Sequence, residues 1–513
     1  MFSSVMSAAI CGIDGCKIVV EADVSDGLPV FSMVGYLASE VREAQDRVRT
    51  ALKNAGIRLP AKRITVNLAP ADVRKAGSGF DLPIAVAVLL CLEQVPAGAA
   101  EGTLFVGELG LDGRINGVRG VMELAACGVR QGCHTCVVPA ENLAEGAAIQ
   151  GIRVLGASHI SQVIRYLRGQ EALEEKNINI EEIRMGRGEN QSEDFSQIQG
   201  QTLLRRAAEV AVSGLHNLLI IGPPGAGKTM TARRIPTILP ELSWEEALEV
   251  SKIHSIAGTL PEDGALLSRR PFRAPHHTVT AAALAGGGRG PRPGEVSLAH
   301  RGILYLDELP EFEKGTLEIL RQPMEEGRIC ITRNSGSYVF PADFMLVASM
   351  NPCKCGYYPD MNRCTCSQRD VQRYLDHVSA PLLDRIDIAV EAGTVNYEEL
   401  TGTGQGECSA AIRERVKQAQ QLQRNRYQGT KYRFNSDLDT AGVRRYCPLD
   451  PTGEKLMRDS FERLELTARS HCRILKVART IADLEGSPGI EAAHLGEAIC
   501  YRSLDQKYWR KAR

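Results

Sequence analysis

The sequence lacks an excess of charge of either sign and lacks a long hydrophobic run. Its 61 lysines and arginines nearly cancel its 62 aspartates and glutamates, for a formal net charge of −1. The composition therefore gives no sign of a globally basic nucleic-acid binder, and any such surface must be local. No stretch reaches the ~18 consecutive apolar residues of a membrane span. The longest apolar segment, residues 82–92, is predicted to be buried core, so no membrane partner is expected.

The amino terminus lacks the basic segment that opens an export signal. The chain is also too long for a disulfide scaffold, although it has 15 cysteines among its 513 residues. A chain of this length should hold about three domains with sizeable cores. We therefore expect a cytoplasmic protein in which most thiols are free or bind metal.

The pattern of strands and helices divides the chain into successive regions. Residues 1–170 alternate between the two, with strands predicted at 17–22, 63–68, 103–106 and 136–139 and a helix at 40–55. Residues 171–194 turn polar and acidic, which is typical of a solvated linker. Residues 195–395 form a second α/β region, and residues 396–513 are mostly helical. The predicted fold class is α/β.

A glycine-rich octet follows the apolar run at 217–221, which is predicted to be a buried parallel strand. The octet consists of Gly222, Pro223, Pro224, Gly225, Ala226, Gly227, Lys228 and Thr229. The glycines let backbone N–H groups turn toward a triphosphate, Lys228 reaches the outer phosphates, and the Thr229 hydroxyl ligates Mg²⁺. The alternative is an ordinary strand–helix turn. The octet predicts a site for ATP and Mg²⁺.

Two further apolar strands end in polar residues suited to nucleotide chemistry. Residues 302–306 lead to Asp307 and Glu308 at a strand's carboxyl end, where α/β sheets place ligands. Asp307 is predicted to hold the Mg²⁺ shell and Glu308 to activate the attacking water. A capped strand end with a solvated acidic pair is the alternative. Residues 344–350 lead to Asn351, which is predicted to lie beside the γ-phosphate and detect hydrolysis.

Arg385 follows Leu382, Leu383 and Asp384, and is predicted to lie beyond the last strand of the core. From there it cannot easily reach its own nucleotide. It could instead complete the site of a neighbouring subunit and stabilise transition-state charge. A surface salt bridge with Asp384 or Asp387 is the alternative.

Together these motifs, in this order, resemble the AAA+ superfamily, specifically the branch of magnesium chelatase ATPase subunits and MCM helicases. Residues 271–277 and 292–300 narrow the resemblance to the ComM/YifB family of magnesium chelatase-like proteins. That resemblance implies an AAA+ core with a helical C-terminal lid, and a homohexamer with ATP at its interfaces. It also implies that Arg469, or else Arg473, supplies a second sensor arginine; we favour Arg469. Helix-face salt bridging is the alternative for both.

The first region resembles Lon-type proteases at residues 74–83 and 113–120. A serine–lysine protease needs a hydroxyl nucleophile beside a lysine that acts as a neutral base. The serine position falls on Gly79 and the lysine position on Arg119, which cannot be deprotonated in a protein. A shifted pair of Ser78 and Lys75 is the alternative. We predict an inactive Lon-like domain that survives for assembly or substrate contact.

Four cysteines directly after Asn351 form two close pairs separated by eight residues, namely Cys353, Cys355, Cys364 and Cys366. Four thiolates around a turn can bind Zn²⁺ tetrahedrally. Such a site would leave no open position, so the zinc would be structural. Free reduced thiols are the alternative.

Two basic loops are candidates for DNA contact. Residues 328–340 are predicted to form a hairpin with Arg333 at its tip, and helicases of the resembled branch project this hairpin into the ring's pore. Residues 285–292 are glycine-rich and contain Arg289 and Arg292. A solvated surface turn is the alternative for each loop.

The ComM-like resemblance implies an ATP-driven DNA helicase or branch-migration factor that acts on single-stranded and branched recombination intermediates during natural transformation. Two other functions stay open. One is a chelatase-type subunit that drives a protein partner; the Asp-x-Ser-x-Ser motif of such systems has its nearest match at Asp23, Ser25 and Gly27, which fails at the last position. The other is an ATP-dependent protease or unfoldase, which Gly79 and Arg119 disfavour.

Overall fold

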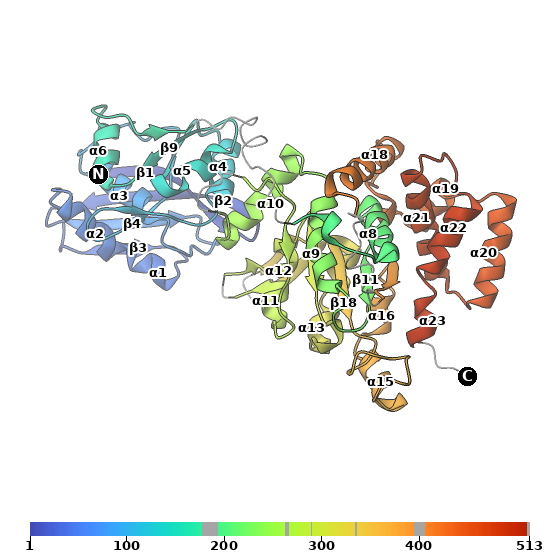
Figure 1. The fold of residues 1–513 in the computed structure, drawn as a ribbon. Coiled ribbons are helices and arrows are strands. Elements are labelled where there is room, and N and C mark those ends of the chain that lie inside the picture. Colours follow the sequence, from blue (N-terminus) through green and yellow to red (C-terminus); the bar gives the residue numbers. More distant parts are fainter. Residues whose placement is uncertain (177–192, 262–265, 289, 334–335, 394–405, 510–513) are drawn as a thin grey trace.

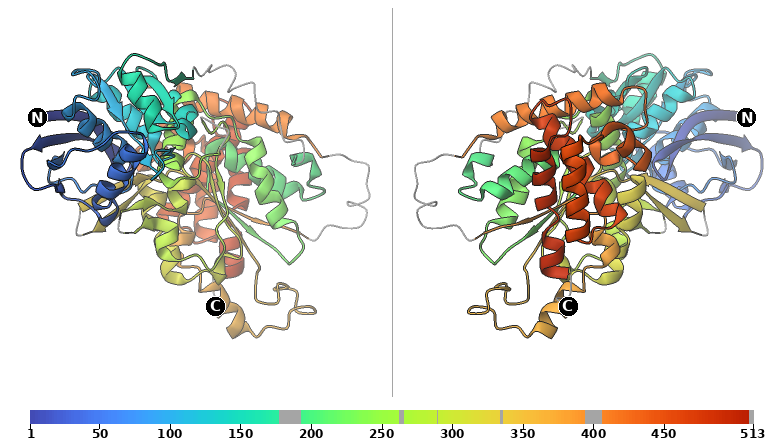
Figure 2. Two further views of the ribbon diagram at one scale, coloured as in Figure 1. Left: turned by 90° about the vertical axis from the view of Figure 1, so that its left-hand side faces the viewer. Right: turned by 90° about the vertical axis from the view of Figure 1, so that its right-hand side faces the viewer.

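The computed structural model describes residues 1–176, 193–261, 266–288, 290–333, 336–393 and 406–509. A first α/β domain lies at one end, a central α/β domain in the middle and a group of helices at the other end (Figure 1). In the two side views of Figure 2, the segment around α15 (Gln368–Leu375) projects from the central domain. No described helix combines the length and hydropathy needed to cross a membrane.

The first domain is built on an eight-stranded sheet with the order β10-β9-β8-β5-β1-β2-β4-β3. Helices pack on both faces of the sheet: helix Asp81–Cys91 shares one apolar core with Val5 and Ala9 of β1, and helix Val121–Arg130 shares a second core with Ala8 of the same strand. The strands are β1 (Phe2–Cys11), β2 (Asp14–Ser25), β3 (Phe31–Val34), β4 (Arg63–Ala69), β5 (Thr103–Phe105), β8 (Thr135–Pro139), β9 (Arg153–Ala157) and β10 (Glu174–Glu175), with β6 (Glu108–Leu109) and β7 (Ile115–Asn116) as a separate pair. The helices are α1 (Ser39–Arg42), α2 (Ala44–Asn54), α3 (Asp81–Cys91), α4 (Val121–Arg130), α5 (Leu143–Ala147) and α6 (Ile160–Leu167).

Most elements predicted for this domain are present, with two differences at their ends. The segment predicted as buried core is α3, in which every residue except Leu90 is buried. The single helix predicted at 40–55 is two helices, since the chain turns at Glu43 between α1 and α2. The segment predicted as a linker begins with β10, which pairs antiparallel with β9, and residues 177–192 of it lie outside the described residues.

The central domain contains a five-stranded parallel sheet with the order β12-β15-β18-β11-β19. The run predicted as a buried strand is β11, which lies between β18 and β19. Leu218 and Ile220 of β11 pack into one core, and Leu219 and Ile221 pack into another on the opposite face. Both faces are covered, which explains why the run is apolar throughout. The strands are β11 (Leu218–Ile221), β12 (Phe272–Arg273), β15 (Ile303–Leu306), β18 (Met345–Met350) and β19 (Ile388–Glu391).

Two hairpins extend the central domain beyond this sheet. The predicted hairpin is confirmed as β16 (Arg328–Arg333) paired with β17 (Gly336–Pro341). A second, shorter one joins β13 (Gly286–Gly287) to β14 (Arg292–Pro293). The remaining helices of the domain are α8 (Thr202–Gly214), α9 (Lys228–Ile238), α10 (Trp244–Ala257), α11 (Ala281–Ala285), α12 (Glu295–Leu298), α13 (Lys314–Glu318), α14 (Arg321–Glu326), α15 and α16 (Ala380–Leu383).

The C-terminal region is helical, as predicted. Its helices are α18 (Ser409–Tyr427), α19 (Thr440–Tyr446), α20 (Pro451–Arg463), α21 (Ala468–Leu484), α22 (Ala492–Cys500) and α23 (Leu504–Trp509). Buried residues of α18 and α21 share one apolar core with α8 and β11, so this region packs directly on the central sheet.

The first domain docks on the central domain through α4 and α10. Lys252 of α10 forms an ion pair with Glu123 of α4 at 3.1 Å, and the Ser255 hydroxyl donates to Glu145. At the tip of the β1–β2 hairpin, Gly12 lies so close to Tyr338 of β17 that an added Cβ would stand 3.2 Å from the ring. The first domain therefore contacts the long hairpin of the central domain.

Candidate nucleotide-binding site

The candidate residues of the central domain converge at one edge of its sheet. Since all five strands are parallel, the segments that follow β11, β15 and β18 emerge side by side. These segments are the glycine-rich octet, the acidic pair and Asn351. The structure thus brings together the three motifs predicted to act on ATP.

The octet forms an open backbone cradle at this edge. Gly225 and Gly227 both have a φ of 79°, in the left-handed region, and nothing lies within 4 Å of where their Cβ atoms would stand. Gly222 is needed for a different reason, because a Cβ there would lie 2.5 Å from the Ala392 carbonyl oxygen. The glycines therefore allow the turn and leave the space in front of the loop free for phosphate.

Lys228 is a buried cation at the start of α9. Its ammonium donates to the carbonyl oxygens of Gly222 and Pro223 at 2.7 and 2.9 Å, and to Asn351 Oδ1 at 2.9 Å. Burial lowers the pKa of Lys228, and the charges of Asp307 and Glu308 act against that shift. Asn351 and Lys228, predicted separately, are in direct contact.

Asp307 follows β15 and is held by two hydroxyl groups. Thr229 Oγ1 donates to Asp307 Oδ2 at 2.8 Å, and Ser349 Oγ donates to the other carboxylate oxygen. Tyr305 lies at 2.8 Å from the Ser349 hydroxyl and completes the network. Burial raises the pKa of Asp307, but hydrogen bonds from Ser349 and Thr229 outweigh it and hold that pKa below its usual value. The carboxylate is therefore ionised, and it lies beside Thr229, the other predicted Mg²⁺ ligand.

Glu308 occupies a conformation that non-glycine residues seldom adopt. Its φ is 52° and its ψ 49°, and such left-handed residues occur preferentially at functional sites. The side chain is 55% exposed, and its carboxylate lies 3.7 Å from His277 Nδ1. His277 follows β12, so a fourth strand of the sheet also contributes to this edge. The sequence alone assigned no chemical role to His277 or Ser349: His277 ends the segment 271–277, which indicates only the family, and Ser349 lies within an apolar strand.

These residues fit a nucleotide and a divalent cation. The loop offers backbone N–H groups and one ammonium for phosphate oxygens, and Thr229 and Asp307 offer the oxygen ligands that Mg²⁺ prefers. Bound Mg²⁺ would neutralise charge on the phosphates. Glu308, which directly follows Asp307, offers an exposed carboxylate that can orient and deprotonate a water molecule.

Arg385 lies at the opposite edge of the same sheet, and its predicted position needs correction. It does not lie beyond the last strand, because β19 follows it; that strand has only four residues and gives a weak pattern. Leu218 at the start of β11 pairs with Ile388, and Asn217 Nδ2 donates to the Arg385 carbonyl at 2.9 Å. Arg385 is thus beside the amino end of β11, whereas the glycine-rich loop follows its carboxyl end.

The Arg385 side chain pairs with Glu325 of α14 rather than with Asp384 or Asp387. It is only 12% exposed, and its Nε has no hydrogen-bond partner among the described residues.

The two candidate second-sensor arginines contact Asp384, the residue next to Arg385. Arg469 Nη1 lies 3.6 Å from one carboxylate oxygen and Arg473 Nη2 lies 3.4 Å from the other. The Arg469 side chain is 69% exposed, whereas that of Arg473 is 8% exposed and donates to the Ile386 carbonyl. Arg385, Arg469 and Arg473 form a group that we name the arginine edge. It lies away from the chain's own glycine-rich loop.

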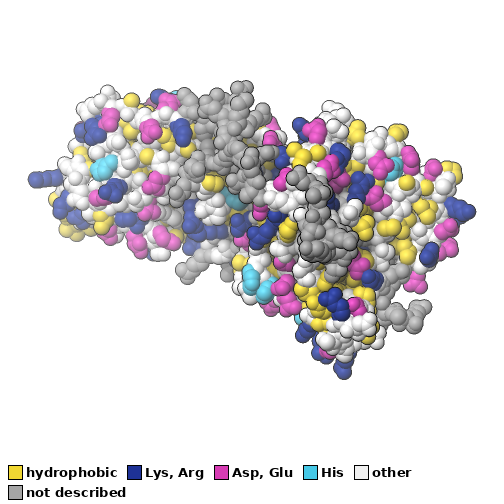
Figure 3. Space-filling model, viewed as in Figure 1, with side chains coloured by type: hydrophobic (Ala, Val, Ile, Leu, Met, Phe, Trp, Pro, Cys, Tyr) yellow, Lys and Arg dark blue, Asp and Glu magenta, His cyan; other side chains and the backbone are white. Residues whose placement is uncertain are grey.

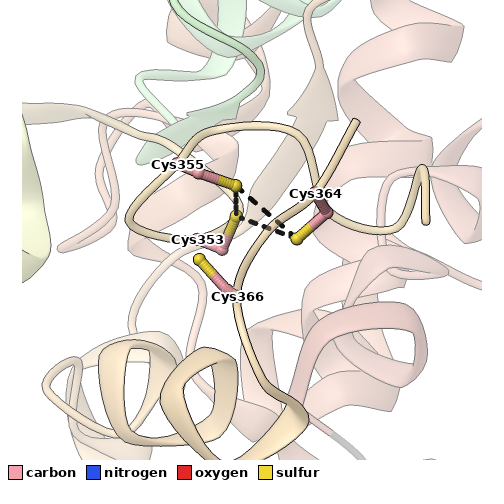
Figure 4. A group of neighbouring side chains, drawn as sticks. All are labelled: Cys353, Cys355, Cys364 and Cys366. Atoms are coloured by element: carbon pink, nitrogen blue, oxygen red, sulfur yellow. Dashed lines mark hydrogen bonds between the residues drawn. The ribbon is translucent and has the colours of Figure 1, made fainter. Parts of the chain in front are cut away.

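The four cysteines after Asn351 converge as predicted (Figure 4). Their four sulfur atoms all lie within 4.8 Å of one another, and Cys353 is buried. Burial raises the pKa of the Cys355 thiol, but backbone hydrogen bonds from Tyr357 and Thr365 outweigh it and lower that pKa to about 6. We name residues 353–366 the cysteine knuckle.

The two predicted DNA-contact loops lie next to each other. Gly287 pairs with Arg292 across β13 and β14, and a Cβ on Gly287 would stand 3.1 Å from Arg333 Nη2. Both arginines are exposed, and neither forms an ion pair with a carboxylate in the described part of the chain. Arg289 lies outside the described residues. A cavity of about 740 Å³ is lined by residues of β16, Arg333 among them, and by residues of α11 and α13. In Figure 3, Lys and Arg side chains gather where the first and central domains meet.

The shifted serine–lysine pair of the first domain is not assembled. The Ser78 hydroxyl donates to Glu108, and the fully buried Lys75 donates to the Pro70 carbonyl. Arg119, which we predicted to stand at the protease-lysine position, turns toward the central domain, since a Cβ on Gly258 would stand 2.7 Å from its Nε.

Comparison with known proteins agrees with this organisation. The family model described as magnesium chelatase, subunit ChlI, matches residues 194–400, a second ChlI model matches 20–142, and a ChlI C-terminal model matches 406–502. The competence protein ComM of Haemophilus influenzae is 40% identical over 501 residues, which cover 98% of this chain and 97% of the relative. YifB of Escherichia coli is 42% identical over 506 residues, with the same coverage.

The magnesium-chelatase 38 kDa subunit of Rhodobacter capsulatus is a more distant relative. It is 28% identical over 176 residues, which cover 31% of this chain and 50% of that subunit. The full-length matches, the parallel sheet with its glycine-rich loop and acidic pair, and the C-terminal helices point to one conclusion. The chain belongs to the ComM/YifB family of magnesium chelatase-like AAA+ proteins.

Proposed function

We propose that the protein is an ATP-hydrolysing motor that acts on single-stranded and branched DNA in the cytoplasm, as a branch-migration factor in natural transformation. The nucleotide site supports ATP hydrolysis with Mg²⁺ as cofactor. The name of the Haemophilus relative links that protein to competence, the uptake of DNA, and its similarity extends over the full chain. None of the 15 cysteines, all of which lie in the described segments, forms a disulfide, which supports a reducing compartment.

The observation that carries the DNA proposal is the juxtaposition of Arg292 and Arg333 on two neighbouring hairpins. Both guanidinium groups are exposed and without carboxylate partners among the described residues, so they are available for backbone phosphates. Contacts of this kind do not read sequence, which suits a motor that moves along DNA. The first domain touches the same hairpin at Tyr338 and is proposed to be a catalytically inactive Lon-like module for assembly or substrate contact.

The arginine edge supports a ring of subunits, with a homohexamer as the proposed form. Arg385 and Arg469 lie at the edge of the sheet opposite the chain's own glycine-rich loop. This position supports a role for each of them at the ATP of a neighbouring subunit. Arg469 is exposed and is the better candidate for the second sensor, while Arg473 is held by a backbone carbonyl.

ATP turnover with forked DNA tests the proposal. The Arg292→Ala/Arg333→Ala double variant should lose DNA-stimulated turnover, keep its basal turnover, and show a salt slope of DNA affinity reduced by about two. The matched control is Arg328→Ala, since Arg328 lies on β16 but pairs with Glu326 at 3.2 Å. Equal DNA stimulation of the double variant and the control would contradict the DNA interface.

A second candidate function is a chelatase-type subunit that drives a protein partner, because the matched models describe magnesium chelatase subunits. The same assay separates the possibilities. Stimulation by a partner chelatase subunit but not by DNA would favour this second candidate, and stimulation by unfolded casein alone would favour an unfoldase.

A further inference from the structure

The sulfur atoms of the cysteine knuckle stand at the separations expected of four ligands around one ion. Cys353 Sγ lies 3.3 Å from Cys355 Sγ and 3.8 Å from Cys364 Sγ, and the last two sulfurs lie 3.6 Å apart. A tetrahedron of thiolates with zinc–sulfur bonds of about 2.3 Å has edges of about 3.8 Å. A disulfide would bring two sulfurs to about 2.05 Å. The spacing fits a shared metal ion better than paired cystines.

The cysteine knuckle also packs closely against the glycine-rich loop. Gly356, between the two cysteine pairs, has a φ of 85°, and an added Cβ would stand 2.3 Å from Cδ and 2.8 Å from Cγ of Pro224. No side chain at position 356 fits against the Pro224 ring. The turn that the cysteines close therefore lies directly against the second proline of the octet.

A second connection runs through the chain itself. Cys353 is two residues after Asn351, which accepts a hydrogen bond from Lys228 at 2.9 Å. On its far side the knuckle contacts α23, where the rings of Tyr358 and Tyr508 lie 6.3 Å apart. The knuckle thus contacts α23 and is also connected to Pro224 and Asn351 of the nucleotide site.

We propose that the cysteine knuckle binds one zinc-class divalent ion and that the ion braces the phosphate loop, so that its presence sets the affinity for ATP. Without the ion, no ligand bonds hold the four sulfur atoms together and the turn at Gly356 loses its support. Pro224 and Asn351 then lose the contacts that fix their positions. This inference rests on the proposed ATP site and adds a second, structural metal to it.

The test uses the full-length protein and two separate measurements: metal content, with Co²⁺ substitution read by its thiolate absorption bands, and binding of a fluorescent ATP analogue. We expect about one zinc ion per chain, lost in Cys364→Ser/Cys366→Ser. That variant, and wild type stripped of zinc with a chelator, should bind the analogue about tenfold more weakly.

Gly356→Ala isolates the contact with Pro224, because it leaves every thiol in place. It should keep the zinc and still lose about tenfold in ATP affinity. Gly429→Ala is the matched control: Gly429 has a similar φ of 75°, but nothing lies within 4 Å of its Cβ position. Lys228→Met should lose ATP binding and keep the zinc, which tests the ATP site independently of the knuckle.

Two results would overturn the inference. If the wild type holds no metal and gives no thiolate bands with Co²⁺, the metal site is wrong. If zinc-free protein and Gly356→Ala bind the analogue as well as wild type does, the knuckle does not support the phosphate loop. The ATP site itself would not be contradicted by that result.

Discussion

The first and central domains each contain a buried lysine near a glycine-rich turn, and the two lysines have different surroundings. Lys228 contacts Asn351 and two loop carbonyls, beside Asp307 and an open backbone cradle. Lys75 is fully buried and donates to the Pro70 carbonyl, while the nearby hydroxyl of Ser78 is engaged by Glu108. Burial lowers the pKa of both lysines.

The comparison teaches that a buried lysine with a lowered pKa does not by itself make a catalytic site. What distinguishes Lys228 is that partners from separate strands converge on it at one sheet edge. Lys75 instead donates to the Pro70 carbonyl, and Arg119 of the same domain faces the central domain. Matched substitutions of the two lysines test this difference.

Replacing each lysine by methionine gives the largest contrast. Lys228→Met should remove detectable ATP turnover and weaken ATP binding by roughly 100-fold or more, because charge-assisted bonds to phosphate are lost. Lys75→Met should leave both unchanged and only lower the melting temperature, since the Pro70 carbonyl loses a donor worth about 1–3 kcal/mol. Calorimetric ATP titration and thermal unfolding measure the two effects. Loss of turnover in Lys75→Met would give the first domain a part in the chemistry.

Arg385→Ala tests whether the central domain completes its site with a neighbour. We expect turnover to fall by about 10³-fold, because transition-state charge loses its cation. Mixed with Lys228→Met subunits, it should regain activity at about one quarter of the interfaces, where an intact loop meets an intact Arg385. Steady-state turnover of an equimolar mixture measures this. Absence of any recovery would mean that Arg385 acts within its own chain or only through its pair with Glu325.

Glu308→Gln has a smaller expected effect. It should bind ATP as tightly as wild type and hydrolyse it about 10²-fold more slowly, because the amide cannot accept a proton from water. Filter binding of labelled ATP, followed by single-turnover hydrolysis, separates the two steps. Asp376→Asn, a carboxylate at the end of α15 that accepts from Gln372, is the control. Turnover at the wild-type rate in Glu308→Gln would remove Glu308 from the chemistry.

Some features of the candidate sites could be predicted from the sequence because their residues are close together in the chain. The octet, the acidic pair and the paired cysteines depend on spacings of a few residues, and the structure brings each group together. Contacts between distant segments could not be predicted this way. Lys228 and Asn351 are 123 residues apart, and the contact of Gly356 with Pro224 leaves no pattern at either position. The strand β19 was missed because four residues give too little periodicity to identify it.

By itself, the sequence determined which groups are available: a loop of glycines with a lysine, acids after apolar strands, four thiols and a set of arginines. Only the tertiary structure decided which of them meet, because parallel strands bring their carboxyl ends to one edge and leave their amino ends at the other. That rule brings the glycine-rich loop, Asp307 and Asn351 together, and it leaves Arg385 beside the amino end of β11, at the opposite edge of the sheet.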